Sequence, residues 1–152
     1  MTDPALFTQL TTEACGDGVH QLVVGAVIAN DNDVLLLHRE QTDFMGGIYE
    51  LPSGKVEPGE TLDTALRREV EEETGLDVTA IIDYLGSFDY TSASGKKSRQ
   101  FNFTTAVSAT EPVRLQEHDG YMWAAPAIDP PVTDAVRSIL EIYVQADEHT
   151  GA

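Results

Sequence analysis

Runs of apolar residues near the start of the chain predict a β-hairpin. Residues 22–28 and 34–37 are apolar throughout, and a short polar turn separates them. Such runs, bounded by turn residues, are typical of strands. A polar leader, residues 1–18, precedes the hairpin, and residues 48–51 predict a further short extended segment that ends at Pro52.

The middle of the chain predicts a helix. Its N-terminus is expected at Thr61, whose hydroxyl can cap the first turn, and the turn-rich segment 53–60 leads into it. The helix should run to about Thr74, and Gly75 should end it in the left-handed conformation. The apolar positions that recur at helical spacing, and so predict its core-facing stripe, are Leu62, Ala65 and Leu66.

The second half of the chain predicts further strands and a final helix. Residues 78–90 and 100–107 are rich in β-branched and aromatic side chains, and the turn residues between them predict that the two strands pair. Residues 121–124 predict a short strand, and apolar positions at helical spacing in 132–144 predict a C-terminal helix. This order predicts one α/β domain over residues 1–152, in which a mixed sheet is sandwiched between helices.

The charge of the chain excludes some partners. Lys and Arg total 9 against 26 Asp and Glu, so the formal net charge is -17. A chain this acidic repels nucleic-acid polymers and anionic membranes, and neither is expected as a partner. If the substrate is itself anionic, metal ions held by clustered carboxylates could reverse the local field.

The N-terminal region bears on the compartment. Cys15 is the one cysteine, so no intrachain disulfide can form and a reducing compartment is expected. Residues 1–18 carry acidic residues where a signal peptide would be positive, and no apolar run is long enough to span a bilayer. A cytoplasmic protein is therefore expected.

The predicted central helix carries carboxylates in an unusual place. Glu69 and Glu73 continue the apolar stripe, and Glu72 lies on its edge. Carboxylates that only solvate a helix belong on the opposite face, where Arg67 and Glu71 can pair. One interpretation is an ordinary solvated face; the other is that the three carboxylates converge against the protein, where their repulsion calls for a cation. Oxygen ligands without histidine or cysteine favour magnesium or manganese over zinc.

Residues 54–76 contain a long fixed pattern. A glycine and a glutamate separated by five residues are followed, seven residues later, by Arg-Glu-aliphatic-x-Glu-Glu-x-Gly-aliphatic. The matching positions are Gly54, Glu60, Arg68, Glu69, Val70, Glu72, Glu73, Gly75 and Leu76. This pattern resembles the Nudix box of the Nudix hydrolase family. The approach to the box departs at one position, because Ser53 stands where many members have a glycine.

The resemblance implies a Nudix fold and a metal-dependent hydrolase that cleaves a phosphoanhydride bond in a nucleoside diphosphate linked to another group. Such chemistry needs a cation to neutralise the diphosphate and activate water, and a base to take the proton. We assign Glu69, Glu72 and Glu73 as ligands of Mg²⁺, with Mn²⁺ as a substitute, and Glu69 can switch to base. By resemblance, the carbonyl of Gly54 is a further ligand and Glu60 supports the loop and the helix.

Other residues are candidates for supporting roles. Arg68 lies four residues before Glu72, so it is expected to fix that rotamer in the active site or to form a surface ion pair of little value. Glu117 lies in a polar loop where many relatives place an extra acidic ligand or base, although loop carboxylates are usually only solvated. Arg39 and Lys55 are candidates for substrate binding, and the alternative for Arg39 is a solubilising residue at a strand end.

Three further groups of residues are expected to be structural. His118 is expected at the surface rather than as a ligand. A cluster of basic residues is expected to be a solvated hairpin tip rather than a phosphate clamp: Lys96, Lys97 and Arg99. Three aromatic residues could stack a nucleobase, but their alternation on predicted strands favours the core: Phe101, Phe103 and Trp123.

Three classes of function remain. The first is an enzyme that hydrolyses free nucleotides, with a nucleoside triphosphate or an oxidised deoxynucleotide, cleaved to a nucleoside monophosphate and pyrophosphate, as the first choice of substrate. Within this class ADP-ribose, nucleotide sugars and dinucleoside polyphosphates stay open, because the box contacts only the diphosphate. The second class is a Nudix-fold module that binds a nucleotide without cleaving it. The third, RNA binding or decapping, is disfavoured by the net charge of -17. A homodimer also stays open.

Overall fold

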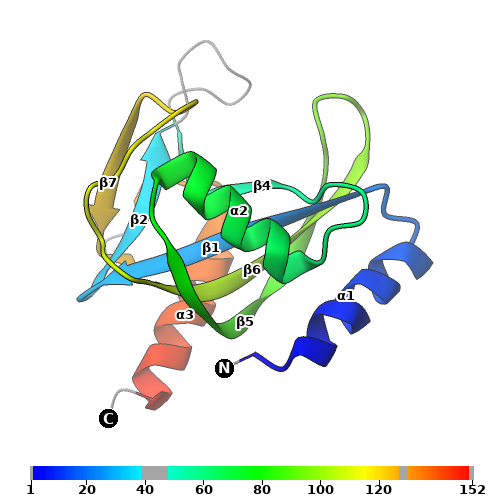
Figure 1. Cartoon of the computed structure of the whole chain (residues 1–152), viewed down its shortest axis with the longest axis horizontal. Coiled ribbons are helices and arrows are strands. Elements are labelled where there is room, and N and C mark those ends of the chain that lie inside the picture. The colour runs from blue at the N-terminus through cyan, green and yellow to red at the C-terminus, as the bar shows by residue number, and fades with distance from the viewer. Residues whose placement is uncertain (1, 39–47, 127–129, 151–152) are drawn as a thin grey trace.

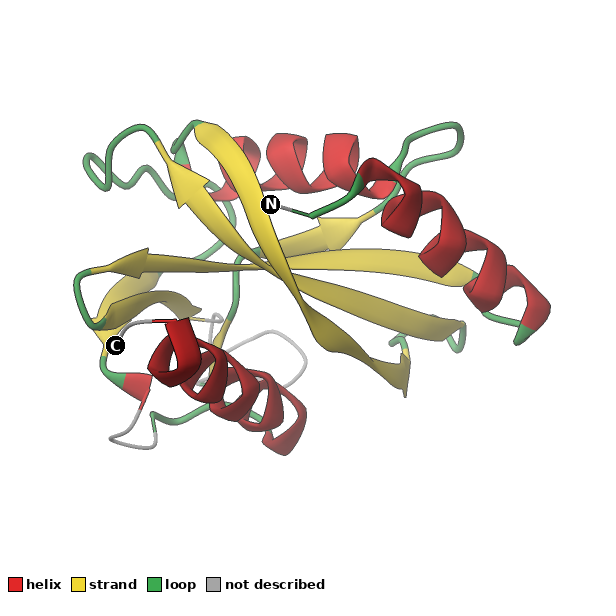
Figure 2. Cartoon of the chain, turned by 90° about the horizontal axis from the view of Figure 1, so that it is seen from below, coloured by secondary structure: helices red, strands yellow, loops and turns green. Residues whose placement is uncertain are grey.

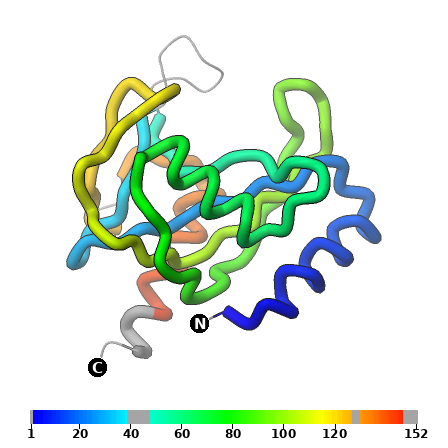
Figure 3. The backbone as a smooth tube through the Cα atoms, in the orientation of Figure 1, coloured from blue at the N-terminus to red at the C-terminus, as the bar shows by residue number. Residues whose placement is uncertain are grey.

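The computed structural model describes residues 2–38, 48–126 and 130–150, with side chains described up to residue 146. Figure 1 shows the arrangement of the elements, and Figure 3 shows the path of the chain. In chain order the helices and strands are α1 (Pro4–Gly16), β1 (Gln21–Asn30), β2 (Asp33–His38), β3 (Tyr49–Glu50), β4 (Ser53–Lys55), α2 (Leu62–Thr74), β5 (Val78–Thr91), β6 (Lys97–Val107), β7 (Gly120–Ala124) and α3 (Asp134–Thr150). None of the described helices is both long and apolar enough to cross a membrane.

The strands form one mixed sheet. Its main path runs in the order β3-β2-β1-β6-β5, while β4 pairs with β1 and β7 pairs with β2 beside that path. β1 and β6 are parallel, and the other strand pairs are antiparallel. The hairpin between β5 and β6 extends beyond the neighbouring strands (Figures 1 and 3). The sheet therefore has a central pair of parallel strands with antiparallel strands outside it.

Helices cover both faces of this sheet, as Figure 2 shows. α1 and α2 share one face, where Phe7, Leu66 and Phe103 belong to a single buried cluster. The rings of Phe7 and Phe103 pack with their centroids 5.6 Å apart. α3 covers the other face, where Val136 and Leu140 belong to a second cluster. The predicted α/β fold, with a mixed sheet between helices, is confirmed.

The predictions that rest on local patterns agree with the structure. The first two apolar runs form the antiparallel pair β1 and β2, and β5 pairs with β6 as expected. α2 ends at Thr74, and Gly75 takes a left-handed φ of 74°, a conformation that glycine adopts without strain. The short strands β3 and β7 and the C-terminal helix also lie where the pattern places them.

Three expectations need correction. The polar leader contains helix α1, and its buried residues Phe7, Leu10 and Ala14 are part of the core. Part of the turn-rich segment forms strand β4, because its backbone pairs with β1. Thr61 is the N-cap residue of α2, but its hydroxyl bonds to the hydroxyl of Thr64 and does not cap the helix.

Candidate active site

α2 buries its carboxylates to different depths. Its apolar stripe is packed against the sheet and consists of Leu62, Ala65, Leu66 and Val70. The side chain of Glu69 is only 13% exposed, whereas that of Glu72 is 52% exposed. Glu73 is also partly buried. Glu69 and Glu73 therefore face the protein, as predicted, and Glu72 lies at the rim.

Glu69 lies directly against the backbone of Gly54. β4 pairs with β1 in a register that places Gly54 opposite Val24. A Cβ atom added to Gly54 would lie 1.9 Å from Cδ of Glu69 and 2.0 and 2.4 Å from its two oxygens. Any side chain at position 54 would therefore displace the Glu69 carboxylate. Glycine at position 54 thus leaves the space that the Glu69 carboxylate occupies.

Arg68 connects the loop before α2 to the carboxylates of the helix. Its Nε and Nη2 donate to the two oxygens of Glu60 at 2.7 and 2.8 Å, and Nη2 also donates to the carbonyl of Lys55 at 3.0 Å. Its Nη1 donates to Glu69 at 2.8 Å and to Glu72 at 3.2 Å. The predicted contact with Glu72 is confirmed, but Glu60 is the bidentate partner. The Arg68 guanidinium lowers the pKa of the Glu60 carboxyl to about 2.

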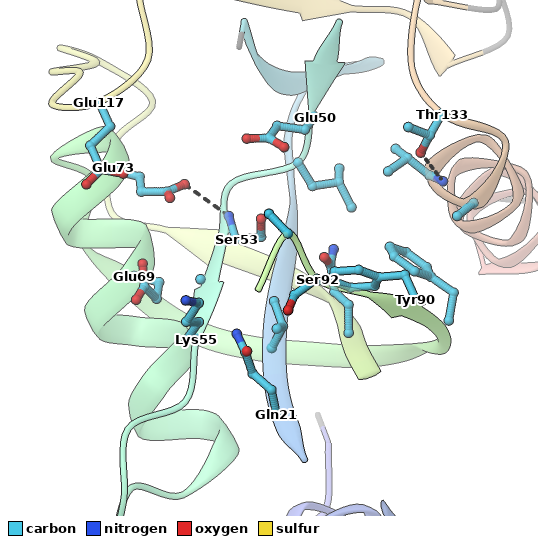
Figure 4. A pocket seen from close by; sticks show the side chains of 18 of the residues that line it. Gln21, Glu50, Ser53, Lys55, Glu69, Glu73, Tyr90, Ser92, Glu117 and Thr133 are labelled. Carbon is cyan, nitrogen blue, oxygen red and sulfur yellow. Dashed lines mark hydrogen bonds between the residues drawn. The ribbon is translucent and has the colours of Figure 1, made fainter. Parts of the chain in front are cut away.

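Glu73 reaches from α2 to the backbone of β4. Its Oε2 accepts a hydrogen bond from the amide of Ser53 at 3.0 Å (Figure 4). Because the donor is a backbone N–H, this contact does not depend on whether position 53 is glycine or serine. Burial raises the pKa of the Glu73 carboxyl to about 8, and the Ser53 amide offsets only part of that effect. At neutral pH the carboxylate form therefore needs a positive partner.

The arrangement fits a hard divalent cation in its donor chemistry. Burial also raises the pKa of the Glu69 carboxyl, although Arg68 opposes this shift. Two partly buried carboxyls, one of them against the backbone of Gly54, offer the oxygen donors that magnesium prefers. In the conformation of the described residues, however, no three His, Cys, Asp or Glu side chains are close enough to hold one ion. The predicted convergence of three carboxylates on one point is therefore not seen, and Arg68 bridges Glu69 and Glu72 instead.

These carboxylates line one end of a large cleft with a volume of about 1200 Å³. Figure 4 shows Glu69, Glu73 and Glu117 on the α2 side of the cleft, with Tyr90 and Thr133 on the opposite side. The box residues that line it are Gly54, Lys55, Arg68, Glu69, Glu72 and Glu73. The three glutamates thus share a cleft wall even though they do not meet at one point.

The structure places the other candidate residues as follows. Glu117 is exposed and lines the cleft, and Lys55 lines it too. Arg39 lies outside the described residues. The expected surface position of His118 is wrong, because its side chain is only 9% exposed and its Nε2 lies 2.7 Å from Oε1 of Glu50. His118 therefore packs against Glu50 of β3, and both residues line the cleft.

The basic hairpin residues bind groups of the protein itself. Arg99 donates to both carboxylate oxygens of Asp89 at 2.7 and 3.0 Å and to Asp17 at 2.9 Å. Lys97 donates to the carbonyl of Asp17 at 2.9 Å. These contacts tie the hairpin to the end of α1, so a structural role agrees with the prediction, although Arg99 is paired rather than solvated.

Sequence reasoning missed part of the cleft. Phe101 and Phe103 are buried in the core, as predicted. The opposite face of the same hairpin, however, presents Phe88, Tyr90 and Gln100 to the cleft. The alternation of Phe88 and Tyr90 along the strand was the available signal, because residues two apart share a face.

Comparison with known proteins identifies the family. The sequence matches the family model for the NUDIX domain over residues 19–135. The chain belongs to the Nudix hydrolase family. Its Nudix box, residues 54–76, runs from β4 through the following loop and α2. The whole box lies within the region that the family model matches.

Individual relatives agree with this assignment. The CTP pyrophosphohydrolase of Escherichia coli (strain K12) is 30% identical over 124 residues, which cover 80% of this Nudix chain and 90% of that protein. The 8-oxo-dGTP diphosphatase of Proteus vulgaris is 41% identical over 58 residues, or 38% of this chain and about half, 52%, of that protein. The MutT protein from Methanosarcina mazei Go1 has a similar structure, with a TM-score of 0.74 and 27% identity over 87% of this chain and 98% of that chain. The solution structure of the E. coli ORF135 protein gives a TM-score of 0.72, with 28% identity over 90% of this chain and 97% of that chain.

Proposed function

We propose that this Nudix chain hydrolyses a phosphoanhydride bond of a nucleoside triphosphate, including oxidised forms, to give a nucleoside monophosphate and pyrophosphate. The observation that carries the proposal is a pair of partly buried carboxyls with raised pKa, Glu69 and Glu73, at one end of a cleft of about 1200 Å³. The names of two relatives, an 8-oxo-dGTP diphosphatase and a CTP pyrophosphohydrolase, support a nucleotide as the substrate.

The proposed cation is Mg²⁺, with Mn²⁺ as a substitute. Its ligands would be the carboxylates of Glu69, Glu72 and Glu73 and the carbonyl of Gly54. When bound, the cation supplies positive charge for the diphosphate oxygens and lowers the pKa of the attacking water. Burial of Glu69 and Glu73 supports this assignment, because two carboxylates with raised pKa are stabilised by a cation.

The protein residues have separate tasks in this proposal. Arg68 holds the carboxylates of Glu69 and Glu72 in place through one guanidinium nitrogen, and Glu60 holds Arg68. Glu69 accepts the proton of the attacking water when it is not serving as a ligand. Glu117, exposed on the rim of the cleft, is a further candidate for acid or base. Lys55 contacts the substrate phosphates.

Two alternatives are distinguished by experiment. One is cleavage of ADP-ribose or a nucleotide sugar. It is supported by the name of a relative from Methanocaldococcus jannaschii, an ADP-ribose pyrophosphatase that is 46% identical over 55 residues. The other is a module that binds a nucleotide without cleaving it. Binding to a nucleotide with no magnesium-dependent turnover across a broad panel would establish that module.

The test is a substrate panel assayed with magnesium and with EDTA, using the unaltered chain and three variants. Glu72→Gln and Glu73→Gln should each lower turnover by on the order of 100-fold or more while the protein stays folded. Glu71→Gln is the matched control, because Glu71 is exposed on the same helix and does not line the cleft. If Glu72→Gln and Glu73→Gln were both as active as the unaltered chain, the site assignment would be wrong.

A further inference from the structure

Two rows of residues cross the sheet on the face that carries α3. Phe101 and Phe103 of β6 point into the opposite cluster, so Gln100 and Asn102, which alternate with them along the strand, point toward α3. The strand register defines one row as Val23, Gln100 and Phe88 and the next row as Gly25, Asn102 and Gly86. Asn102 therefore has a glycine on each side, and Gln100 lies one row closer to the hairpin tip.

The two amide side chains lie over Gly25. A Cβ atom on Gly25 would lie 2.5 Å from Oδ1 of Asn102 and 2.5 Å from Nε2 of Gln100. The glycine thus leaves the space that the amide pair fills. Asn102 is fully buried, whereas Gln100 is 7% exposed and lines the cleft.

The hydrogen bonds of Asn102 fix which way round the Gln100 amide lies. Nδ2 of Asn102 donates to the carbonyls of Gly86 and Gln100, both at 3.2 Å. Its Oδ1 must then accept, and it accepts from Nε2 of Gln100 at 2.8 Å. Turning either amide over would place two acceptors or two donors together in a buried site, which is costly. Oε1 of Gln100 makes no hydrogen bond within the described part of the chain, so it is a fixed, unused acceptor.

Gln100 belongs to the same cleft as the box carboxylates. Phe88 and Tyr90, with ring centroids 6.2 Å apart, line the cleft beside it, and Thr133 and Val136 line it from the α3 side. Flat aromatic faces next to a polar group are suited to a planar heterocycle. The cleft thus has two parts: the α2 carboxylates line the part suited to the phosphates, and Gln100 with the aromatic rings lines the part suited to a base.

We infer that Gln100 is a specificity-determining residue, whose Oε1 accepts a hydrogen bond from an amino group of the nucleobase. This inference rests on the proposed function, because it assigns the base-binding part of the same cleft. A keto oxygen in place of the amino group would face Oε1 as a second acceptor, and neither atom could donate. A site built to bond such a group rejects an analogue that lacks it, here by about tenfold or more.

The test compares nucleotides that differ in an exocyclic amino group, which a keto oxygen replaces in UTP relative to CTP and in ITP relative to ATP, and which hydrogen replaces in ITP relative to GTP. Values of kcat/KM are measured with magnesium for CTP against UTP and for ATP or GTP against ITP. Titration calorimetry measures Kd for the α,β-methylene analogues of the same nucleotides. We expect the amino-bearing member of the preferred pair to be favoured at least about tenfold in both measurements.

Variants then assign this preference to Gln100. Gln100→Met keeps the length of the side chain but removes both polar atoms, and it should bring the ratio close to one. Asn102→Ala leaves Gln100 in place but frees its amide to turn over, so the ratio should also fall. Gln9→Met on α1, whose exposed side chain donates to Glu13 and does not line the cleft, is the control and should leave the ratio unchanged. Thermal unfolding shows whether each variant is folded. The nucleotide ratios measured on the unaltered chain test the inference even if a variant fails to fold.

The outcomes distinguish a failure of this inference from a failure of the proposed function. Turnover without any preference for the amino-bearing nucleotide overturns the inference about Gln100 and leaves the proposed function standing, as does a preference that survives in Gln100→Met. Selective binding of the CTP analogue without turnover of any nucleotide supports the inference and overturns the proposed hydrolysis. Absence of both binding and turnover overturns both.

Discussion

Replacing Gly54 by alanine tests whether its contact with Glu69 positions an active-site carboxylate. The added Cβ would lie 1.9 Å from Cδ of Glu69 and 2.0 Å from the nearer oxygen. Ordinary contacts between such atoms are about 3.5 Å, so the carboxylate must retreat by roughly 1.5 Å. A misplacement of about 1 Å in a reacting site can cost on the order of 100-fold in rate. We therefore expect kcat to fall by about this factor, while the sheet and α2 remain folded.

The assay measures magnesium-dependent release of pyrophosphate from the best substrate of the panel, with thermal unfolding as the check on folding. Titration with Mn²⁺, followed by electron paramagnetic resonance, gives a second readout, and its affinity should weaken in Gly54→Ala. Gly16→Ala is the matched control, because a Cβ at that position meets no atom within 4 Å. A folded Gly54→Ala protein with kcat within about threefold of the unaltered chain would refute the reasoning.

Three other perturbations have expected outcomes. Glu60→Gln should lower the free energy of unfolding at pH 7 by on the order of 2–3 kcal/mol, more than Glu57→Gln does, because Arg68 holds the pKa of Glu60 at about 2. Since this pKa is depressed from 4.5, the difference should be present above that pH and shrink as the pH falls toward 2, which urea unfolding at several pH values would show. A difference that grew on acidification would contradict the assignment. Arg68→Lys should lower kcat more than it raises KM, because a lysine cannot hold Glu60 and the helix carboxylates together, whereas Arg67→Lys should leave both constants near their original values. Phe7→Ala should cost about 3–5 kcal/mol of stability in urea unfolding without changing kcat at a temperature where the protein is folded, and a negligible cost would show that α1 is not part of the core.

Much of the active site could be predicted because its pattern is local. The spacing of Leu62, Leu66, Glu69 and Glu73 fixes which face of a helix each occupies, and the structure agrees. Gly75 ends the helix because its left-handed φ of 74° suits glycine, a property of the residue itself. Element order and alternation also predicted a mixed sheet between helices.

The features that the sequence left open depend on contacts between distant segments. The leader looks polar, and only packing against Phe103 of β6 reveals that Phe7 belongs to the core. Ser53–Lys55 becomes a strand because β1 supplies its hydrogen bonds. Similarly, the partner of His118 is Glu50 of β3, which lies 68 positions away in the chain.

The sequence by itself thus determined the family, the carboxylate helix and the order of the elements, since each depends on residues a few positions apart. The tertiary structure decided that Arg68 binds Glu60 more extensively than Glu72, and that Gly54 touches Glu69. It also decided that Gln100 faces the cleft with its amide held in one orientation. These facts follow from strand register and from the packing of helices on the sheet, which bring together atoms that no short-range pattern relates.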